Sequence, residues 1–196
     1  MKRLVFMLMT LFVTNTAEAM QVPCVVSSKG YFRIHVGTGG LFGGFAHEHL
    51  IEADKVEGCA TIKRGDLAHS SIKLAFSKLR VIDPKESSKD RADVQKTMDT
   101  EVLRVSEFPQ VSFESTSVQG SADAGQMTVT GNLTIRGKTI LVTIPLELTH
   151  FEDGTYRAIG KYNFKQSIFG IKPIQLAGGT IKVKDQLQTE FEIFLR

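Results

Sequence analysis

Residues 90–118 read DRADVQKTMDTEVLRVSEFPQVSFESTSV, and residues 131–139 read GNLTIRGKT after a short polar gap. Asp90 can cap a helix here, and the apolar residues that follow recur at steps of three or four: Val94, Met98, Val102 and Val105. Phe108-Pro109 should end the helix, because the residue before a proline is disfavoured in helical geometry. The stretch therefore predicts one main helix near Asp90–Val105, then two alternating strands, the second of which ends at Arg136-Gly137.

The same alternation of apolar and polar residues recurs along the rest of the chain. The predicted apolar rows are Phe32, Ile34 and Val36; Ile72, Leu74 and Phe76; Met127, Val129, Leu133 and Ile135; Ile140, Val142, Ile144, Leu146 and Leu148; Leu187, Thr189, Phe191, Ile193 and Leu195. Strands with one apolar and one polar face are typical of antiparallel sheets, and glycine-containing turns separate these runs. About eight such strands favour an all-β closed barrel or a sandwich, with one helix.

The first nineteen residues have the features of a secretory signal peptide. Lys2 and Arg3 precede an apolar run of about ten residues, too short for a bilayer that needs roughly twenty. Ala17-Glu18-Ala19 then supplies the small-x-small cleavage pattern. We expect residues 1–19 to be a signal peptide, which predicts a periplasmic protein without stable membrane insertion after cleavage.

The remaining length fits one domain, which we place at residues 22–196. The chain of 196 residues has a net charge of +3, and the loss of Lys2, Arg3 and Glu18 lowers this to +2. Basic residues are scattered rather than clustered. Such a balance argues against nucleic acid as a partner.

Cys24 and Cys59 are the two cysteines of the chain. In an exported protein an isolated pair is more often a disulfide than a metal site. The residue numbers of paired positions in a hairpin have a constant sum. The cysteine pair therefore centres on Leu41-Phe42, within the glycine-rich turn Gly37–Gly44. We expect a disulfide that pins the first hairpin, with two separately buried thiols as the alternative.

Five motifs resemble, in order along the chain, those of the YceI-like family. They are the glycine-rich turn ending in Gly44-Phe45 after a strand with Phe32 and Ile34, Asp90-Arg91, Phe113-Glu114-Ser115-Thr116, Gly131–Gly137 and Phe169-Gly170-Ile171. The chain departs from the pattern at Ala46-His47-Glu48-His49, where many relatives have no paired histidines. This departure leaves the head group of its ligand open.

The resemblance implies a single antiparallel, lipocalin-like barrel of eight strands that holds a polyisoprenoid or another long acyl lipid. An eight-stranded barrel can also be filled by its own side chains, so the residues alone leave a solid core open. We expect Arg91 to be either a surface charge or an anchor for an anionic head group. The residues expected to line the apolar interior are Phe32, Ile34, Phe45, Leu74, Phe76, Phe113, Leu133, Ile144 and Phe169.

The histidines offer a different function, that of a metal-binding or stress-response protein. On a strand, His47 and His49 would project from one face, a spacing found in zinc sites. His35 could be a third ligand by hairpin pairing. The simpler interpretation is a polar pair at the barrel mouth, with no metal.

No nucleophile elbow, zincin helix, dinucleotide-binding or phosphate-loop motif occurs in the sequence. We therefore expect a binding protein rather than an enzyme. We expect it to need no cofactor and to act as a monomer or homodimer.

Overall fold

The computed structural model describes residues 22–40, 48–63, 69–121 and 125–196. The expected signal peptide (1–19), Phe45 and His47 lie outside these residues. The strands are β1 (Val25–Gly39), β2 (His49–Thr61), β3 (Ser71–Val81), β4 (Val111–Ser121), β5 (Gln126–Ile135), β6 (Lys138–His150), β7 (Tyr156–Lys165), β8 (Gln175–Leu176) and β9 (Ile181–Leu195).

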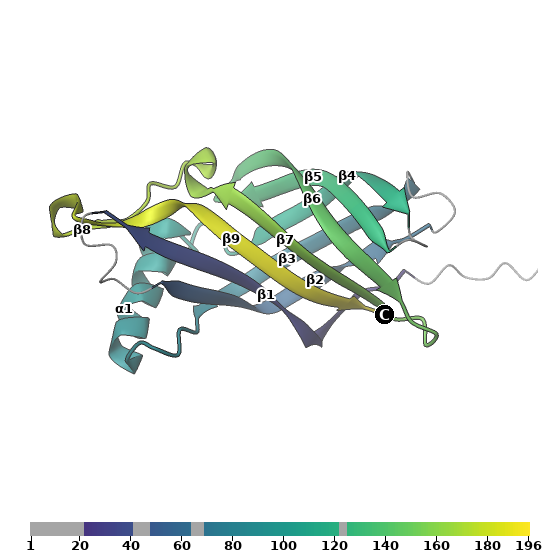
Figure 1. The fold of residues 1–196 in the computed structure, drawn as a ribbon, viewed down its shortest axis with the longest axis horizontal. Coiled ribbons are helices and arrows are strands. Elements are labelled where there is room, and N and C mark those ends of the chain that lie inside the picture. The colour runs from purple at the N-terminus through teal and green to yellow at the C-terminus, as the bar shows by residue number, and fades with distance from the viewer. Residues whose placement is uncertain (1–21, 41–47, 64–68, 122–124) are drawn as a thin grey trace, which may run out of the picture.

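The eight long strands form a closed antiparallel barrel (Figure 1). Each strand from β1 to β6 pairs with the next, β7 pairs with β9, and β9 pairs with β1 to close the ring. The two-residue β8 pairs with β9 only. The all-β, eight-stranded antiparallel barrel predicted from the sequence is confirmed.

Strand β5 shows why these residues form a barrel wall. Its predicted apolar row is buried, and the residues between are more exposed: the buried members are Met127, Val129, Leu133 and Ile135. The hairpin to β6 turns on Arg136 and Gly137, whose φ angles are 50° and 71°. Two consecutive positive φ angles are those of the tight turn that matches the twist of paired strands. The alternation and the turn together fix which face of β5 points inward.

The helix differs from the predicted one at both ends. Helix α1 (Ser88–Thr97) continues as a π-helical turn, η3 (Met98–Val102). Its cap is Ser87, not Asp90, because the Ser87 hydroxyl accepts the backbone N–H of Asp90 at 3.1 Å. It ends before Phe108-Pro109, because Arg104 has a φ of 53°, the left-handed conformation that terminates helices.

Helix α1 lies at one end of the barrel and is attached by polar contacts (Figure 1). None of its residues is fully buried. The Gln95 side chain accepts the backbone N–H of Val81 and donates to the carbonyl of Leu79, both at 2.9 Å. Arg136 donates to the carbonyl of Val102 at 3.1 Å. These hydrogen bonds tie the helical segment to β3 and to the β5–β6 turn.

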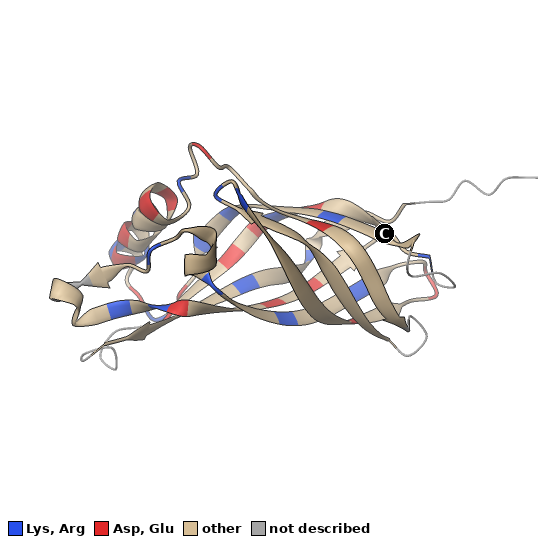
Figure 2. Cartoon of the chain, turned by 90° about the horizontal axis from the view of Figure 1, so that it is seen from above, with Lys and Arg blue, Asp and Glu red and all other residues tan. Residues whose placement is uncertain are grey.

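Two short 3₁₀ segments complete the described structure. They are η4 (Gln166–Phe169), which follows β7, and η5 (Ala177–Gly179), which precedes β9. Lysines, arginines and acidic residues are spread over the strands and α1 (Figure 2). No helix among the described residues is long and apolar enough to cross a membrane.

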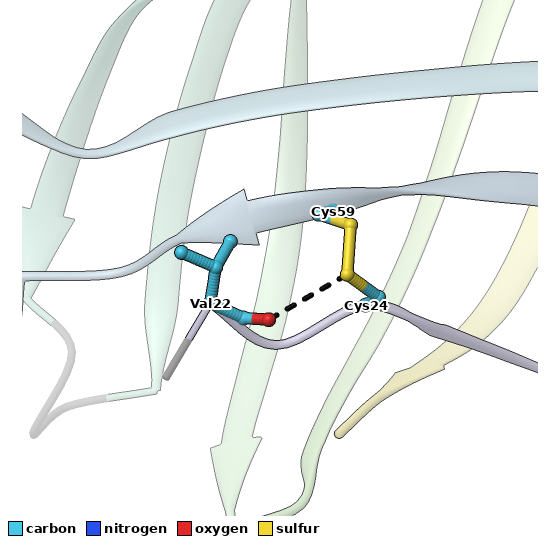
Figure 3. The surroundings of a disulfide bond; sticks show 3 residues. All are labelled: Val22, Cys24 and Cys59. Atoms are coloured by element: carbon cyan, nitrogen blue, oxygen red, sulfur yellow. Dashed lines mark hydrogen bonds between the residues drawn. A yellow bond between two sulfur atoms is a disulfide. The ribbon is translucent and has the colours of Figure 1, made fainter. Parts of the chain in front are cut away.

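The expected disulfide between Cys24 and Cys59 is present and joins the start of β1 to the end of β2 (Figure 3). The predicted constant register of this hairpin was wrong. Val36 pairs with His49, and Cys24 pairs with Cys59. Between these two pairs the first strand advances by twelve positions and the second by ten. The register of β1 against β9 also shifts, between Val25 and Gly30, and the φ of Gly30 is 81°. A bulge of this kind adds residues to one strand only.

Candidate ligand-binding cavity

The barrel encloses a cavity of about 440 Å³. Its walls come from the seven strands β1 to β7, from β9, and from the helical segment α1–η3. Seven of the nine apolar residues expected to line the interior do so: Phe32, Ile34, Leu74, Phe76, Phe113, Leu133 and Ile144. The barrel is therefore hollow, with an apolar cavity, and is not filled by its own side chains.

Strand register brings several of these residues together. Leu74 of β3 pairs with Phe113 of β4, and Phe113 pairs with Leu133 of β5. Directly paired residues point to the same face of a sheet, so the three side chains form one apolar row across the wall. The row follows from the alternation of the three strands once their register is known.

Three aromatic rings of the lining lie close to one another. The ring centroids of Phe32 and Phe76 are 4.3 Å apart, and those of Phe32 and Phe191 are 6.3 Å apart. The three rings come from β1, β3 and β9. Aromatic residues supply large apolar area, and the Phe32–Phe191 separation is that of a favourable ring pair.

The other predicted site residues lie elsewhere. Phe169 is buried, but its ring packs edge-on against Phe164 at 5.5 Å and does not line the cavity. Arg91 is also absent from the lining. Its guanidinium donates to the backbone carbonyls of Asp83 and Glu86, at 3.1 and 2.7 Å, and so holds the β3–α1 loop. Phe45 lies outside the described residues.

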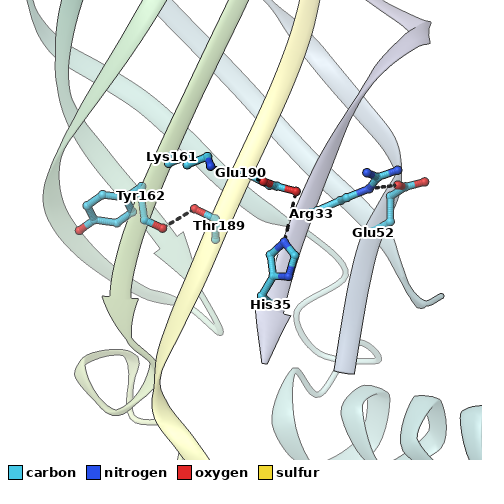
Figure 4. Close-up of polar contacts among 7 residues, drawn as sticks. All are labelled: Arg33, His35, Glu52, Lys161, Tyr162, Thr189 and Glu190. Carbon is cyan, nitrogen blue, oxygen red and sulfur yellow. Dashed lines mark hydrogen bonds and ion pairs between the residues drawn. The ribbon is translucent and has the colours of Figure 1, made fainter. Parts of the chain in front are cut away.

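A few polar side chains interrupt the apolar lining. His49, Asp93 and Thr97 lie where the cavity meets β2 and α1, and Tyr162 and Thr189 lie on β7 and β9. The Thr189 hydroxyl donates to the carbonyl of Tyr162 at 2.6 Å and is satisfied within the wall (Figure 4). Burial raises the pKa of the Tyr162 phenol, because the apolar surroundings disfavour the phenolate.

The structure does not bring His35 and His49 together. Val36 pairs with His49, and successive side chains of a strand point to opposite faces, so His35 lies on the outer face and His49 on the cavity side. His35 Nε2 lies 3.2 Å from Glu190 Oε1, in a row of outward polar contacts that includes the Arg33–Glu52 ion pair at 2.7 Å (Figure 4). His47, which was expected to form a pair with His49, lies outside the described residues.

Sequence reasoning missed several lining residues. The apolar rows of β5, β6 and β9 contained four of them without identifying them as lining: Met127, Leu146, Leu187 and Phe191. No sequence pattern identified Tyr162 and Gln166 as lining residues. The pattern of one segment does not show which of its polar side chains neighbouring segments will cover.

Comparison of the sequence with protein families shows to which family the chain belongs. Residues 28–195 match the YceI-like domain. The chain belongs to the YceI-like family. It is 31% identical over 169 residues to UPF0312 proteins of Pseudomonas aeruginosa strains LESB58 and PAO1, a match that covers 81% of each chain.

Solved structures of the same fold have lower sequence identity to this YceI-like protein. Burkholderia cenocepacia BcnA has 18% identity and a TM-score of 0.69, over 87% of this chain and 98% of BcnA. A polyisoprenoid binding domain from Saccharophagus degradans, implicated in plant cell wall breakdown, has 9% identity and a TM-score of 0.64, over 89% and 97% of the two chains. The Campylobacter jejuni YCEI protein has 13% identity and a TM-score of 0.55, over 74% and 82%. At these identities the likeness establishes the shared barrel fold.

Proposed function

We propose that this protein binds a long-chain polyisoprenoid or a similar amphiphilic lipid in its barrel and carries or stores it without chemical conversion. The observation that carries the proposal is the cavity of about 440 Å³, whose lining is almost entirely apolar. Ligand cavities commonly span about 300–1,000 Å³. The polyisoprenoid binding domain from S. degradans, which shares the fold, adds support.

The energetics favour a ligand with a long hydrocarbon chain. Each methylene group removed from water contributes about 0.8 kcal/mol, so a prenyl chain needs no polar contact to bind well. Aromatic and aliphatic walls from eight strands offer that environment along the barrel. The polar residues His49, Asp93 and Thr97 at the α1 end are available to the polar end of an amphiphile.

We place the protein in the periplasm. The expected signal peptide and the Cys24–Cys59 disulfide both support export, since disulfides persist in oxidising compartments. A compartment between two membranes is also where a lipid needs a water-soluble carrier.

Blocking the cavity tests the proposal. Ile144 lines the cavity, whereas the adjacent Thr143 is exposed on the outer face. Ile144→Trp should fold, because the cavity has room for the larger ring, and should lose bound lipid. Thr143→Trp is the matched control and should keep it.

The measurement is native mass spectrometry, with lipid extraction, of protein exported in its own host. Wild-type protein that carries no lipid would overturn the proposal. So would an Ile144→Trp variant with an undiminished lipid load.

A further inference from the structure

Three side chains with metal-binding atoms meet at the α1 end of the barrel. His49 begins β2, and Asp83 and Glu86 lie in the loop between β3 and α1. One ligand atom from each residue lies within 4.8 Å of the other two. His49 Nδ1 is 3.0 Å from Glu86 Oε1. Asp83 and Glu86 are three residues apart in one loop, and the fold brings His49, which is distant in sequence, beside them.

Each of these side chains has a buried polar atom without a hydrogen-bond partner. The atoms are His49 Nδ1, Asp83 Oδ2 and Glu86 Oε2, and no other described residue has such a side-chain atom. Asp83 is only 3% exposed, and the side chain of Glu86 only 7%. The close approach of His49 to Glu86 lacks hydrogen-bond geometry. Two carboxylates so deeply buried are costly unless a cation compensates them.

The backbone around the cluster is held in place. Besides the two carbonyls that Arg91 binds, Asp83 Oδ1 accepts the backbone N–H of Lys85 at 2.9 Å. Ile82 N–H donates to the carbonyl of Leu50 at 2.8 Å, which joins the loop to the strand that carries His49. The loop is therefore fixed by its own hydrogen bonds, while the carboxylate oxygens Asp83 Oδ2 and Glu86 Oε2 remain available.

We propose that His49, Asp83 and Glu86 bind a divalent transition-metal ion, with Zn²⁺ as the ion of best fit. One imidazole nitrogen and two carboxylate oxygens are a donor set that zinc uses, and three protein ligands leave a fourth position for water or an exogenous group. An ion of charge +2 neutralises the two carboxylates. Bond lengths of about 2.0–2.2 Å require the donor atoms to be about 3.5 Å apart, so binding needs small side-chain rotations.

This site differs from the set His35, His47 and His49 that the sequence suggested. It also stands independently of lipid binding, although His49 lines the cavity as well. The ion would therefore lie at the edge of the cavity, on the side of α1.

Zinc titration of protein prepared without a histidine tag and stripped with a chelator tests the proposal. Isothermal titration calorimetry should show one equivalent of Zn²⁺ bound by the wild type. His49→Gln, Asp83→Asn and Glu86→Gln should each weaken binding at least about tenfold, the scale on which removal of supporting groups alone acts. Zinc should raise the melting temperature of the wild type and not that of these variants.

His35→Gln is the matched control, because His35 also lies beside a glutamate, Glu190, but on the outer face. Its zinc binding should equal that of the wild type. If a ligand variant does not fold, Co²⁺ added to the wild type gives a second measurement. A tetrahedral visible spectrum that one equivalent of Zn²⁺ abolishes supports the site. Absence of saturable binding at one equivalent, or a loss of binding in His35→Gln alone, would overturn it.

Discussion

A Cβ atom at Gly160 would lie 2.3 Å from Cζ of Phe191, so the ring of Phe191 occupies the space that a side chain at position 160 would need. The two residues are directly paired between β7 and β9. Gly131 on β5 pairs with Ser115 instead, but a Cβ atom there would lie 2.5 Å from Cζ of Phe113. Glycine inside a strand often marks such a close approach. Both rings line the cavity, so the two glycines set where its walls lie.

Gly160→Ala should therefore displace the Phe191 ring and destabilise the barrel. Overpacking of this kind costs about 1–3 kcal/mol, measurable as a lower free energy of unfolding in urea. Gly39→Ala is the control, since the nearest heavy atom to its Cβ would be 3.8 Å away. Equal stability of the two variants would contradict this account of the wall.

The alternating rows were enough to predict an antiparallel, all-β fold from the sequence. In β5 and β9 the apolar row falls on the buried face, because a period of two leaves each strand one face to bury. The family resemblance contributed the choice of a barrel over a sandwich. Seven lining residues followed from these two sources without knowledge of the register.

Removal of the Cys24–Cys59 disulfide should lower stability without changing the fold. The bridge closes a loop with a sequence separation of 35 residues, which corresponds to about 3–4 kcal/mol of lost chain entropy in the unfolded state. The double variant Cys24→Ser/Cys59→Ser should show this loss in chemical denaturation. Wild-type protein in reductant should match it. A stable wild type whose thiols both react with an alkylating reagent before reduction would disprove the bridge.

Alkaline pH should destabilise the protein through Tyr162. Its pKa is raised in the folded state, so the folded protein holds this proton at a pH where the unfolded chain has released it. The stabilising contribution is complete below the ordinary tyrosine pKa of about 10 and is lost as the pH rises through the folded-state pKa. Unfolding measured from about pH 9 upward should show this decline. Tyr162→Phe should reduce the decline, and an unchanged slope would contradict the assignment.

Features that depend on several segments were not predictable from local patterns. The two extra residues of β1 between the Val36–His49 and Cys24–Cys59 pairs broke the expected constant register, and no motif marks that bulge. Arg91 was expected to be either a surface charge or an anchor for a head group, yet its guanidinium binds carbonyls of the preceding loop. The grouping of His49 with Asp83 and Glu86 arises only when the β3–α1 loop meets the start of β2.

Cys24 and Arg196 exchange two backbone hydrogen bonds, from Cys24 N–H at 2.9 Å and from Arg196 N–H at 2.8 Å. The first and last residues of the barrel are thus neighbours in the strand ladder. Consider a circular permutant joined by a short linker from residue 196 to residue 24 and opened at Arg136-Gly137. Every strand would keep its present neighbours, and only the covalent connection at that hairpin would be lost. The closed ring of strands therefore does not depend on which two residues are the chain termini.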